Sequence, residues 1–267
     1  MNRILFETDE IQDGIATFGG ERAEHVMNVL HGEIGQVLKT GEINGPIGTS
    51  VITGISSSLV PHPSSLSITV RCAHTEKSIL PWIDLILAPP RPRVMKRLLP
   101  QLATMGVGRI FLVGAKKVEK DFWGATLLKP ENYRPLLIDG LMQSGTSILP
   151  TLETRRNFRK FVKEELDGLW PESRRIVAHP YGADSTRISA NMANARESFV
   201  EIRSIREDSC SETVVLAVGP EGGWTDDEIA LLEEHGFVRY SLGSRILRTD
   251  TATIALLAQL MKEFGAC

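Results

Sequence analysis

The sequence predicts an α/β protein with a small β-rich N-terminal part and a larger part in which strands and helices alternate. Over residues 1–74, short runs of β-favouring residues are separated by Gly, Asn, Pro and Ser. After about residue 78, apolar β-rich runs alternate with helical windows. That alternation is typical of a mostly parallel sheet covered by helices. We therefore expect two domains, residues 1–74 and 75–267, of which the first forms a small β-barrel.

The N-terminal part is predicted to contain four strands and one helix. Each predicted strand is rich in apolar or β-branched residues and is bounded by turn residues such as Asn44-Gly45-Pro46. The helix is expected over residues 21–30. The strands are expected over residues 3–6, 35–40, 48–55 and 65–72.

The C-terminal part is predicted to contain five strands and five helices. Its strands are short apolar runs, as expected when a strand is buried on both faces. They are expected over residues 82–88, 109–113, 175–178, 213–218 and 238–242. The helices are expected over residues 93–104, 133–142, 158–166, 226–235 and 252–264.

The composition is that of a globular protein, with 42% apolar and 24% charged residues, which excludes a disordered, coiled-coil or collagen-like chain. The formal net charge of −3 argues against a general nucleic-acid binder. However, residues 75–160 carry 15 basic and 7 acidic residues, while the segments on either side are acidic. Such a block is typical of a face that binds a polyanion, although a solvated helix face would produce the same pattern.

Neither a disulfide framework nor a metal site is expected. The three cysteines, Cys72, Cys210 and Cys267, are far apart, and the histidines lack the spacing of metal ligands.

The first residues are acidic and contain no apolar run of signal-peptide length, and no later run is long enough to cross a membrane. We therefore expect a soluble cytoplasmic protein without a membrane partner, or one in an organelle matrix if a targeting peptide has been removed.

The strand predicted over residues 213–218 runs into the sequence Gly219-Pro220-Glu221-Gly222-Gly223-Trp224. Thr225 and Glu228, which follow it, match the capping box that begins many helices. Glycines at the carboxyl end of a strand allow a ligand to approach the backbone. The loop lacks both nucleotide-binding glycine patterns, and an acidic residue in it would repel a phosphate. A neutral or cationic ligand is favoured over an anionic one, with a purely structural turn as the alternative.

A second glycine-containing loop follows the last predicted strand and reads Ser241-Leu242-Gly243-Ser244-Arg245-Ile246-Leu247-Arg248. Thr249 or Asp250 is expected to cap the helix after it. Glycine, an apolar pair and two cations could hold a flat heterocycle beside an anion. Two ordinary surface arginines are the alternative interpretation.

Taken together, the two loops resemble the signature of the SPOUT-type methyltransferases. The segments Gly-Pro-Glu-Gly-Gly-Trp-Thr and Ser-Leu-Gly-Ser-Arg-Ile-Leu-Arg-Thr-Asp-Thr-Ala occur here in the order and spacing of that family. They are especially similar to those of the bacterial 16S ribosomal RNA uracil-N3 methyltransferases. Arg3 with Phe6, Ala178-His179-Pro180 and Gln143-Ser144 are also similar to this family, so that the resemblance extends over nearly the whole chain.

The resemblance implies a PUA-like β-barrel that binds RNA, followed by a SPOUT α/β domain with a trefoil knot. It also implies a homodimer and a pocket for S-adenosylmethionine where loops near residues 178–182, 218–224 and 242–251 meet, with no metal. The partner would be ribosomal RNA or the small ribosomal subunit. The cofactor-binding residues that it implies are His179, Val218, Gly219, Glu221, Gly222, Gly223, Leu242, Gly243, Ile246, Leu247, Thr249 and Thr251.

The reaction implied is transfer of a methyl group to N3 of a uridine in small-subunit ribosomal RNA. Because that nitrogen carries a proton, a nearby cation that stabilises the deprotonated ring would help. We assign this catalytic role to Arg248, and we leave the general base unassigned. The residues expected to bind RNA, largely through phosphates, are Arg3, Arg91, Arg93, Lys96, Arg97, Lys116, Lys117 and Arg245.

The sequence departs from the family pattern mainly outside the two loops. Thr104-Met105-Gly106 replaces Glu-Leu-Gly, Gln143-Ser144-Gly145-Thr146 lacks an acid and an arginine, and Asp250 stands where Glu is commoner. Two alternatives therefore remain. One is an RNA-binding or ribosome-assembly factor without turnover, and the other is a SPOUT enzyme with a different RNA target.

Overall fold

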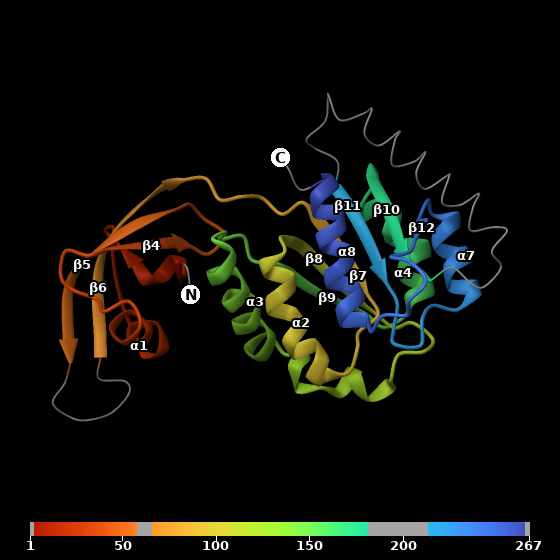
Figure 1. Ribbon diagram of the computed structural model, residues 1–267, viewed down its shortest axis with the longest axis horizontal. Coiled ribbons are helices and arrows are strands. Elements are labelled where there is room, and N and C mark those ends of the chain that lie inside the picture. The colour runs from red at the N-terminus through yellow and green to blue at the C-terminus, as the bar shows by residue number, and fades with distance from the viewer. Residues whose placement is uncertain (1–2, 58–65, 181–212, 265–267) are drawn as a thin grey trace. The chain divides into compact units, whose positions relative to one another are not determined.

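The computed structural model describes residues 3–57, 66–180 and 213–264 (Figure 1). The chain forms two compact units, Met1–Leu80 with Arg134–Leu149, and Pro81–Tyr133 with Pro150–Cys267, called unit 1 and unit 2 below. The expected division at residue 74 was drawn without the mid-chain segment, which packs in unit 1. Arg3 donates its backbone N–H to the Met142 carbonyl at 3.1 Å, and Arg134 forms an ion pair with Glu7.

Unit 1 is a curled six-stranded sheet with one short helix against it. The sheet has the order β1-β4-β5-β6-β3-β2, in which β1 and β4 are parallel and the other neighbours antiparallel. Its elements include all four predicted strands and the predicted helix, so this part of the prediction is confirmed. They are β1 (Ile4–Phe6), β2 (Ile11–Gln12), β3 (Ile15–Gly19), α1 (Gly20–Asn28), β4 (Val37–Glu42), β5 (Ile47–Ser57) and β6 (Leu66–Glu76), with a 3-10 turn η1 at Thr8–Glu10.

The hairpin formed by β2 and β3 was missed by the sequence analysis. Gln12 pairs with Ile15, so that Asp13 and Gly14 alone form the turn, with φ of +50° and +74°. An Asp-Gly pair is the preferred sequence for such a two-residue turn, so the signal was present. The strands are short, and residues 15–19 alternate exposed and buried, as expected for a sheet with one face on the core.

The core of unit 1 lies between the curled sheet and α1. It contains Phe6 and Phe18, whose rings lie 5.5 Å apart, together with Ala23 and Val26 of the helix. The Arg3 guanidinium donates to the carbonyls of Thr40 at 2.6 Å, Gly48 at 3.0 Å and Gly145 at 3.1 Å. Burial lowers the pKa of Arg3. The guanidinium of Arg3, which was predicted to contact RNA, therefore binds backbone carbonyls of unit 1.

Unit 2 contains a six-stranded sheet in which all neighbouring strands are parallel, in the order β12-β10-β11-β7-β8-β9. An α/β domain with a parallel sheet was predicted and is confirmed. The strands are β7 (Ile83–Leu87), β8 (Val107–Val113), β9 (Thr151–Arg155), β10 (Ser173–Ala178), β11 (Thr213–Val218) and β12 (Val238–Tyr240). Of these, only β9 was missed; its residues are exposed or half-buried, which hides the apolar pattern of a strand.

Helices cover both faces of this sheet (Figure 1). α2 and α8 contact each other on one face, while α4, α5 and α7 pack on the other against Phe111, Val177 and Val215. The helices are α2 (Pro92–Thr104), α4 (Phe158–Glu164), α5 (Leu166–Leu169), α7 (Asp226–Glu234) and α8 (Thr249–Phe264). α3 (Pro130–Ser144) lies mostly in unit 1, and two 3-10 turns, η3 (Lys120–Gly124) and η4 (Thr126–Leu128), precede it.

The start of α8 differs from the prediction. The Arg248 carbonyl accepts the N–H of Ala252 at 2.8 Å, the first bond of the helix, so Arg248 occupies the capping position. Thr249 and Asp250 lie inside the first turn instead. A Thr side chain is a common cap, but here the Thr249 hydroxyl is buried and points to the Gly219 carbonyl, 3.5 Å away. The predicted capping residue was therefore wrong by one or two positions.

Two searches of the described residues bear on the expected partners. No described helix is both long enough and apolar enough to span a membrane. Likewise, no three His, Cys, Asp or Glu side chains within the described ranges gather as they would around a metal ion. The trefoil knot expected from the resemblance stays a prediction.

Candidate functional site

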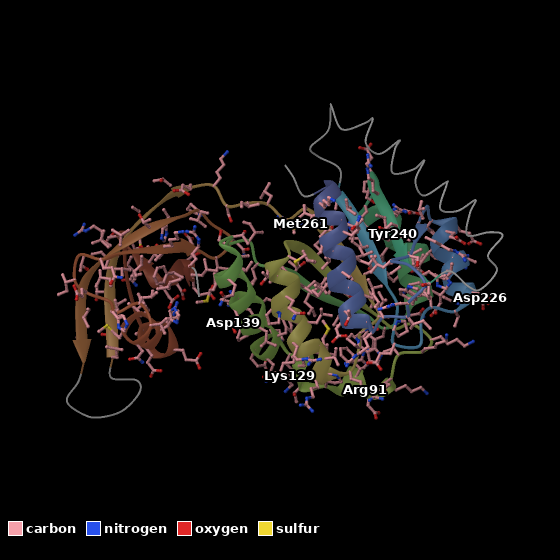
Figure 2. The ribbon with its side chains drawn as sticks, in the orientation of Figure 1. Arg91, Lys129, Asp139, Asp226, Tyr240 and Met261 are labelled. Atoms are coloured by element: carbon pink, nitrogen blue, oxygen red, sulfur yellow. The ribbon has the colours of Figure 1, made fainter. Side chains whose placement is uncertain are left out.

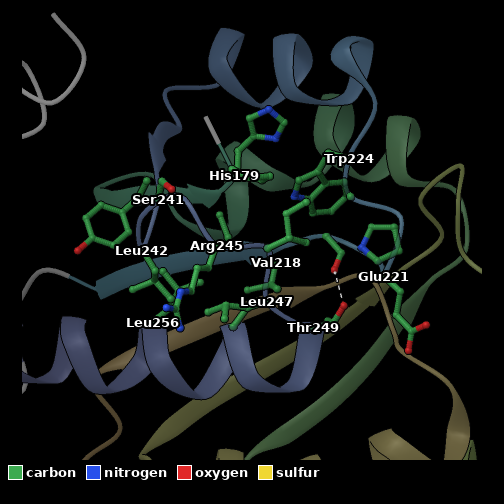
Figure 3. Close-up of a pocket in the computed structure, with 18 of the residues that line it drawn as sticks. His179, Val218, Glu221, Trp224, Ser241, Leu242, Arg245, Leu247, Thr249 and Leu256 are labelled. Atoms are coloured by element: carbon green, nitrogen blue, oxygen red, sulfur yellow. Dashed lines mark hydrogen bonds between the residues drawn. The ribbon is translucent and has the colours of Figure 1, made fainter. Parts of the chain in front are cut away.

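A pocket of about 290 Å³ lies among the described residues at the carboxyl ends of β10, β11 and β12 (Figure 3). In open α/β sheets, ligands bind at this edge of the strands. The residues that line it come from three loops and from α8: Ala178, His179, Pro180, Val218, Gly219, Pro220, Glu221, Gly222, Gly223, Trp224, Tyr240, Ser241, Leu242, Gly243, Arg245, Ile246, Leu247, Thr249, Ala252 and Leu256.

The loop of residues 219–224, called the β11 loop, is held by the buried carboxylate of Glu228. One oxygen of that carboxylate accepts the Lys116 N–H at 2.7 Å, and the other accepts the Thr225 N–H at 2.8 Å and hydroxyl at 3.0 Å. The capping box predicted for Thr225 and Glu228 is confirmed. Because the same side chain also binds the loop after β8, the two loops are joined. The β11 loop is therefore preformed.

Trp224 forms one wall of the pocket and is 4% exposed. Its ring packs on Phe158, with the centroids 5.1 Å apart. A Cβ atom added at Gly219 would lie 3.0 Å from the indole, so a side chain at this position would crowd the buried ring. The buried indole N–H has no hydrogen-bond partner among the described residues. A buried donor without a partner is costly, which suggests that a ligand accepts from it.

The loop of residues 241–248, called the β12 loop, is exposed along most of its length. Ile246 is 88% exposed, and Leu242 and Leu247 are exposed too. Gly243 has φ of +125°, a conformation available to glycine but strained for other residues. The loop returns to the β11 loop at its end, where the Thr249 hydroxyl points to the Gly219 carbonyl. Both loops thus border one pocket.

His179 follows β10 and lies half-buried at the pocket. Its backbone N–H donates to the Tyr240 carbonyl at 3.1 Å, which joins the ends of β10 and β12. Burial, reinforced by the positive charge of Arg239, lowers the pKa of His179 below its ordinary value. The imidazole is therefore neutral at pH 7. Its buried Nδ1 has no partner among the described residues, as is the case for the Trp224 indole.

The structure brings together eleven of the twelve residues predicted to bind the cofactor. His179, Val218, Gly219, Glu221, Gly222, Gly223, Leu242, Gly243, Ile246, Leu247 and Thr249 all line the pocket. Thr251 does not line it and lies exposed in the first turn of α8. Residues 181 and 182, which were expected to contribute to the third loop, lie outside the described residues.

Several lining residues were not singled out from the sequence. Most of them adjoin predicted residues in the same loops: Ala178, Pro180, Pro220, Trp224, Tyr240 and Ser241. Ala252 and Leu256 are different, because they reach the pocket from the first two turns of α8. They are four positions apart, the spacing that places residues on one face of a helix, so helical periodicity could have identified them.

The predicted cations lie in different places. Arg245 lines the pocket, whereas Arg248 does not; its side chain is 67% exposed, with Nε 3.6 Å from the Asp250 carboxylate. Arg97 of α2 approaches the same carboxylate at 3.3 Å, which brings α2 next to the end of the β12 loop. The Lys117 ammonium donates to the Gly222 carbonyl at 2.7 Å. The predicted basic surface therefore borders the pocket at these points.

The remaining predicted RNA contacts of unit 2 are exposed at or near the start of α2 and after β8. Arg91 pairs with Glu119 at 3.1 Å, and Figure 2 labels it next to the N-terminal end of α2. Arg93, Lys96 and Lys116 have exposed side chains. All three are available to a polyanion.

Comparison with known proteins agrees with the family and the fold that the two glycine loops predict. Residues 76–261 match the family model described as "RNA methyltransferase domain". The chain is 28% identical to ribosomal RNA small subunit methyltransferase E of Treponema pallidum, with 100% of this chain and 92% of that protein covered. It is 26% identical to ribosomal RNA small subunit methyltransferase E 1 of Borreliella burgdorferi, covering 96% and 95%.

Two solved structures share the fold over nearly the whole chain. One is the putative methyltransferase Lpg2936 from Legionella pneumophila in complex with bound SAM, with 23% identity, a TM-score of 0.68, and 98% and 97% of the chains covered. The other is a ribosomal RNA small subunit methyltransferase E from Neisseria gonorrhoeae bound to S-adenosyl methionine, with 21% identity, a TM-score of 0.66, and 98% and 97% covered. Since the family model spans both glycine loops and every strand of unit 2, this chain belongs to the RNA methyltransferase domain family.

Proposed function

We propose that this protein transfers a methyl group from S-adenosylmethionine to small-subunit ribosomal RNA. The observation that carries the proposal is that the β11 and β12 loops border the same pocket, in a chain of the RNA methyltransferase domain family. Relatives over the full length are named as methyltransferases of small-subunit ribosomal RNA, which supports this RNA as the substrate.

The chemistry of the pocket suits this methyl donor. Leu242, Ile246, Leu247 and Leu256 offer apolar surface for an adenine ring. A Cβ atom added at Gly223 or Gly243 would meet nothing within 4 Å, so a ligand can reach the backbone there. The neutral His179 and the Trp224 indole supply unpaired polar atoms. No cluster of phosphate-binding groups is required, because the donor carries a sulfonium cation and no phosphate.

We further propose that the acceptor atom is N3 of a uridine, as the resemblance implies. The bound donor supplies an electrophilic methyl group. The chain must stabilise the uridine ring as it loses its N3 proton, and Arg248 is the proposed catalytic cation for that purpose. It lies between two pocket residues, Leu247 and Thr249, and its exposed side chain is free to turn toward an RNA. N3 lies on the Watson–Crick edge, so the base must be unpaired or flipped out.

The cations around the pocket are proposed to hold RNA phosphates. Arg91, Arg93, Lys96, Arg97, Lys116, Lys117 and Arg245 belong to this set, all in unit 2. Arg3 was included in the same expectation, but its guanidinium already binds three carbonyls. Phosphate contacts release counterions, so the affinity for RNA should fall steeply with salt.

We also propose that the protein acts as a homodimer. The β12 loop presents Ile246, Leu242 and Leu247, which line the pocket, partly to solvent, and a second copy would cover such an apolar patch. Light scattering after gel filtration tests this. A dimer that dissociates in Ile246→Asp supports the proposal, and a monomeric wild-type protein contradicts it.

One pair of measurements tests the proposed function. Calorimetry should show S-adenosylmethionine binding to the purified protein. Mapping of modified nucleotides in ribosomal RNA from a deletion strain should show the loss of a methyl group at N3 of one uridine. Binding without any lost methyl group would favour a ribosome-assembly factor, and loss of a methyl group elsewhere would favour a SPOUT enzyme with another target.

A further inference from the structure

A second, smaller hollow lies beside the pocket and shares a wall with it. It has a volume of about 40 Å³ and is lined by Pro89, Pro90, Arg91, Lys117, Val118, Glu119, Phe122, Pro220 and Glu221. Pro220 and Glu221 also line the first pocket, so these two residues separate the two spaces. The hollow faces the ends of β7, β8 and β11, whereas the first pocket faces β10, β11 and β12.

The hollow lies at the topological switch point of the parallel sheet. Starting from β7, the chain adds β8 and β9 on one side; it then forms β10 on the other side, places β11 between β10 and β7, and finally adds β12 outside β10. The strand order therefore reverses between β7 and β11. In open α/β sheets this switch point leaves a crevice at the carboxyl edge, which is where ligands bind. Pro89 and Pro90 follow β7, and Pro220 and Glu221 follow β11, so the hollow lies at the switch point.

The lining combines apolar surface with charged side chains. Pro89, Pro90, Val118, Phe122 and Pro220 offer a surface against which a flat ring can lie. Arg91 and Lys117 are already engaged, the first with Glu119 and the second with the Gly222 carbonyl. Glu221 is exposed, and within the described part of the chain its carboxylate interacts electrostatically with Arg91 but forms no hydrogen bond. Figure 3 shows its carboxylate directed away from Leu242 and Arg245 of the first pocket.

We propose that this hollow receives the acceptor uracil and that Glu221 accepts its N3 proton, as the general base of the reaction. The inference rests on the proposed function, because it requires the methyl donor in the neighbouring pocket. A transfer between two reactants needs two adjoining sites, and the described structure offers them with Glu221 on the wall between them. The backbone of Glu221 then borders the donor, while its carboxylate faces the acceptor.

A carboxylate at this position also selects the base. An ionised carboxylate can only accept hydrogen bonds. The N3 of uracil carries a hydrogen and donates, whereas the N3 of cytosine carries none. Glu221 therefore binds the edge of uracil that reacts. Arg91 and Lys117 line the hollow, where they exchange their contacts with Glu119 and the Gly222 carbonyl for the phosphates next to the flipped nucleotide.

The step balances in charge and atoms. The N3 proton passes to the Glu221 carboxylate, which becomes a neutral acid. The nitrogen electron pair forms the bond to the methyl carbon, and the bond from that carbon to sulfur breaks, with its electron pair remaining on sulfur. The sulfonium becomes a neutral thioether, and Glu221 later releases its proton to water.

The test is single-turnover methyl transfer to small-subunit ribosomal RNA by Glu221→Gln, with Glu234→Gln as the control. Both variants replace an exposed carboxylate of unit 2 by its neutral isostere, but Glu234 lies on α7 and lines neither space. In Glu221→Gln the transfer rate at neutral pH should fall about 100-fold or more, the usual effect of losing a general base. The Kd of S-adenosylmethionine should change by about threefold at most.

The pH profile separates catalysis from a structural role. At alkaline pH the imide ionises without a base, so the deficit of Glu221→Gln should shrink as pH rises. A wild-type rate in Glu221→Gln, or a deficit that stays constant with pH, would overturn the assignment.

A second variant, Val118→Phe, tests the acceptor site. It places a ring in the hollow and should abolish methyl transfer while S-adenosylmethionine still binds, and a normal rate of transfer in this variant would contradict the acceptor site. If the wild-type protein itself fails to bind S-adenosylmethionine, the proposed function fails instead.

Discussion

The two glycine loops of unit 2 are equally conspicuous in the sequence but differ in structure. The β11 loop is anchored at its carboxyl end, where Trp224 packs on Phe158 and Glu228 joins Thr225 to Lys116. The β12 loop is exposed from Leu242 to Arg248. The difference shows that one wall of the pocket is built by the fold of unit 2 itself. The other wall, the β12 loop, stays exposed until a ligand or a partner molecule covers it.

The largest effect expected from this contrast is in the exposed β12 loop. Arg248→Ala should lower the single-turnover rate of methyl transfer by about 100-fold or more, because the cation that stabilises the forming uridinate is lost. Its stability should match the wild type, since the side chain is 67% exposed. Rapid-quench kinetics and thermal unfolding measure the two quantities. An unchanged rate would remove Arg248 from the mechanism.

In the anchored β11 loop the effect should fall on stability. Both carboxylate oxygens of Glu228 accept N–H groups, so in Glu228→Gln the amide NH2 must face one of these donors. We expect a loss of about 1–3 kcal/mol in the free energy of unfolding and weaker S-adenosylmethionine binding. Denaturant unfolding measures the first. The exposed Glu234→Gln on the same helix is the control, and equal stability of the two variants would contradict the anchoring role.

The variant Ile246→Ser tests the contrast between the two loops in the exposed β12 loop. Because Ile246 is 88% exposed, the free energy of unfolding should change by less than about 0.5 kcal/mol. The affinity for S-adenosylmethionine should nevertheless fall, since the side chain lines the pocket. Calorimetry beside denaturant unfolding gives both values. A large loss of stability with unaltered binding would show that the loop is structural.

The smallest effect concerns pH. The pKa of His179 is lowered in the folded protein, so the unfolded chain binds more protons between that lowered value and about 6.5. Stability from this residue is therefore complete above pH 6.5 and is lost as pH falls through that window. His179→Asn should flatten this part of the profile of unfolding midpoint against pH. If the profile of His179→Asn is as steep as that of the wild type, other groups cause the pH dependence of stability. The first of these to examine is His74, whose pKa is also lowered by burial.

Sequence reasoning worked best where one physical requirement dominates. Buried parallel strands must be apolar on both faces, and the strand predicted over residues 213–218 has those bounds in the structure as β11. The glycines of the two loops were singled out because a glycine at the carboxyl end of a strand lets a ligand approach the backbone. It missed β9, which is exposed, and the hairpin at Asp13-Gly14, whose strands are short.

The sequence by itself determined most of the strands and helices in their order, the capping box at Thr225 and Glu228, and eleven of the residues that border the pocket. Each depends on local patterns, on spacing or on a resemblance carried by contiguous motifs. Only the tertiary structure placed α3 with unit 1, turned Thr249 from a cap into a link with Gly219, and brought Pro89 beside Glu221. These depend on pairs far apart in the chain, and no local pattern encodes which distant side chains share a space.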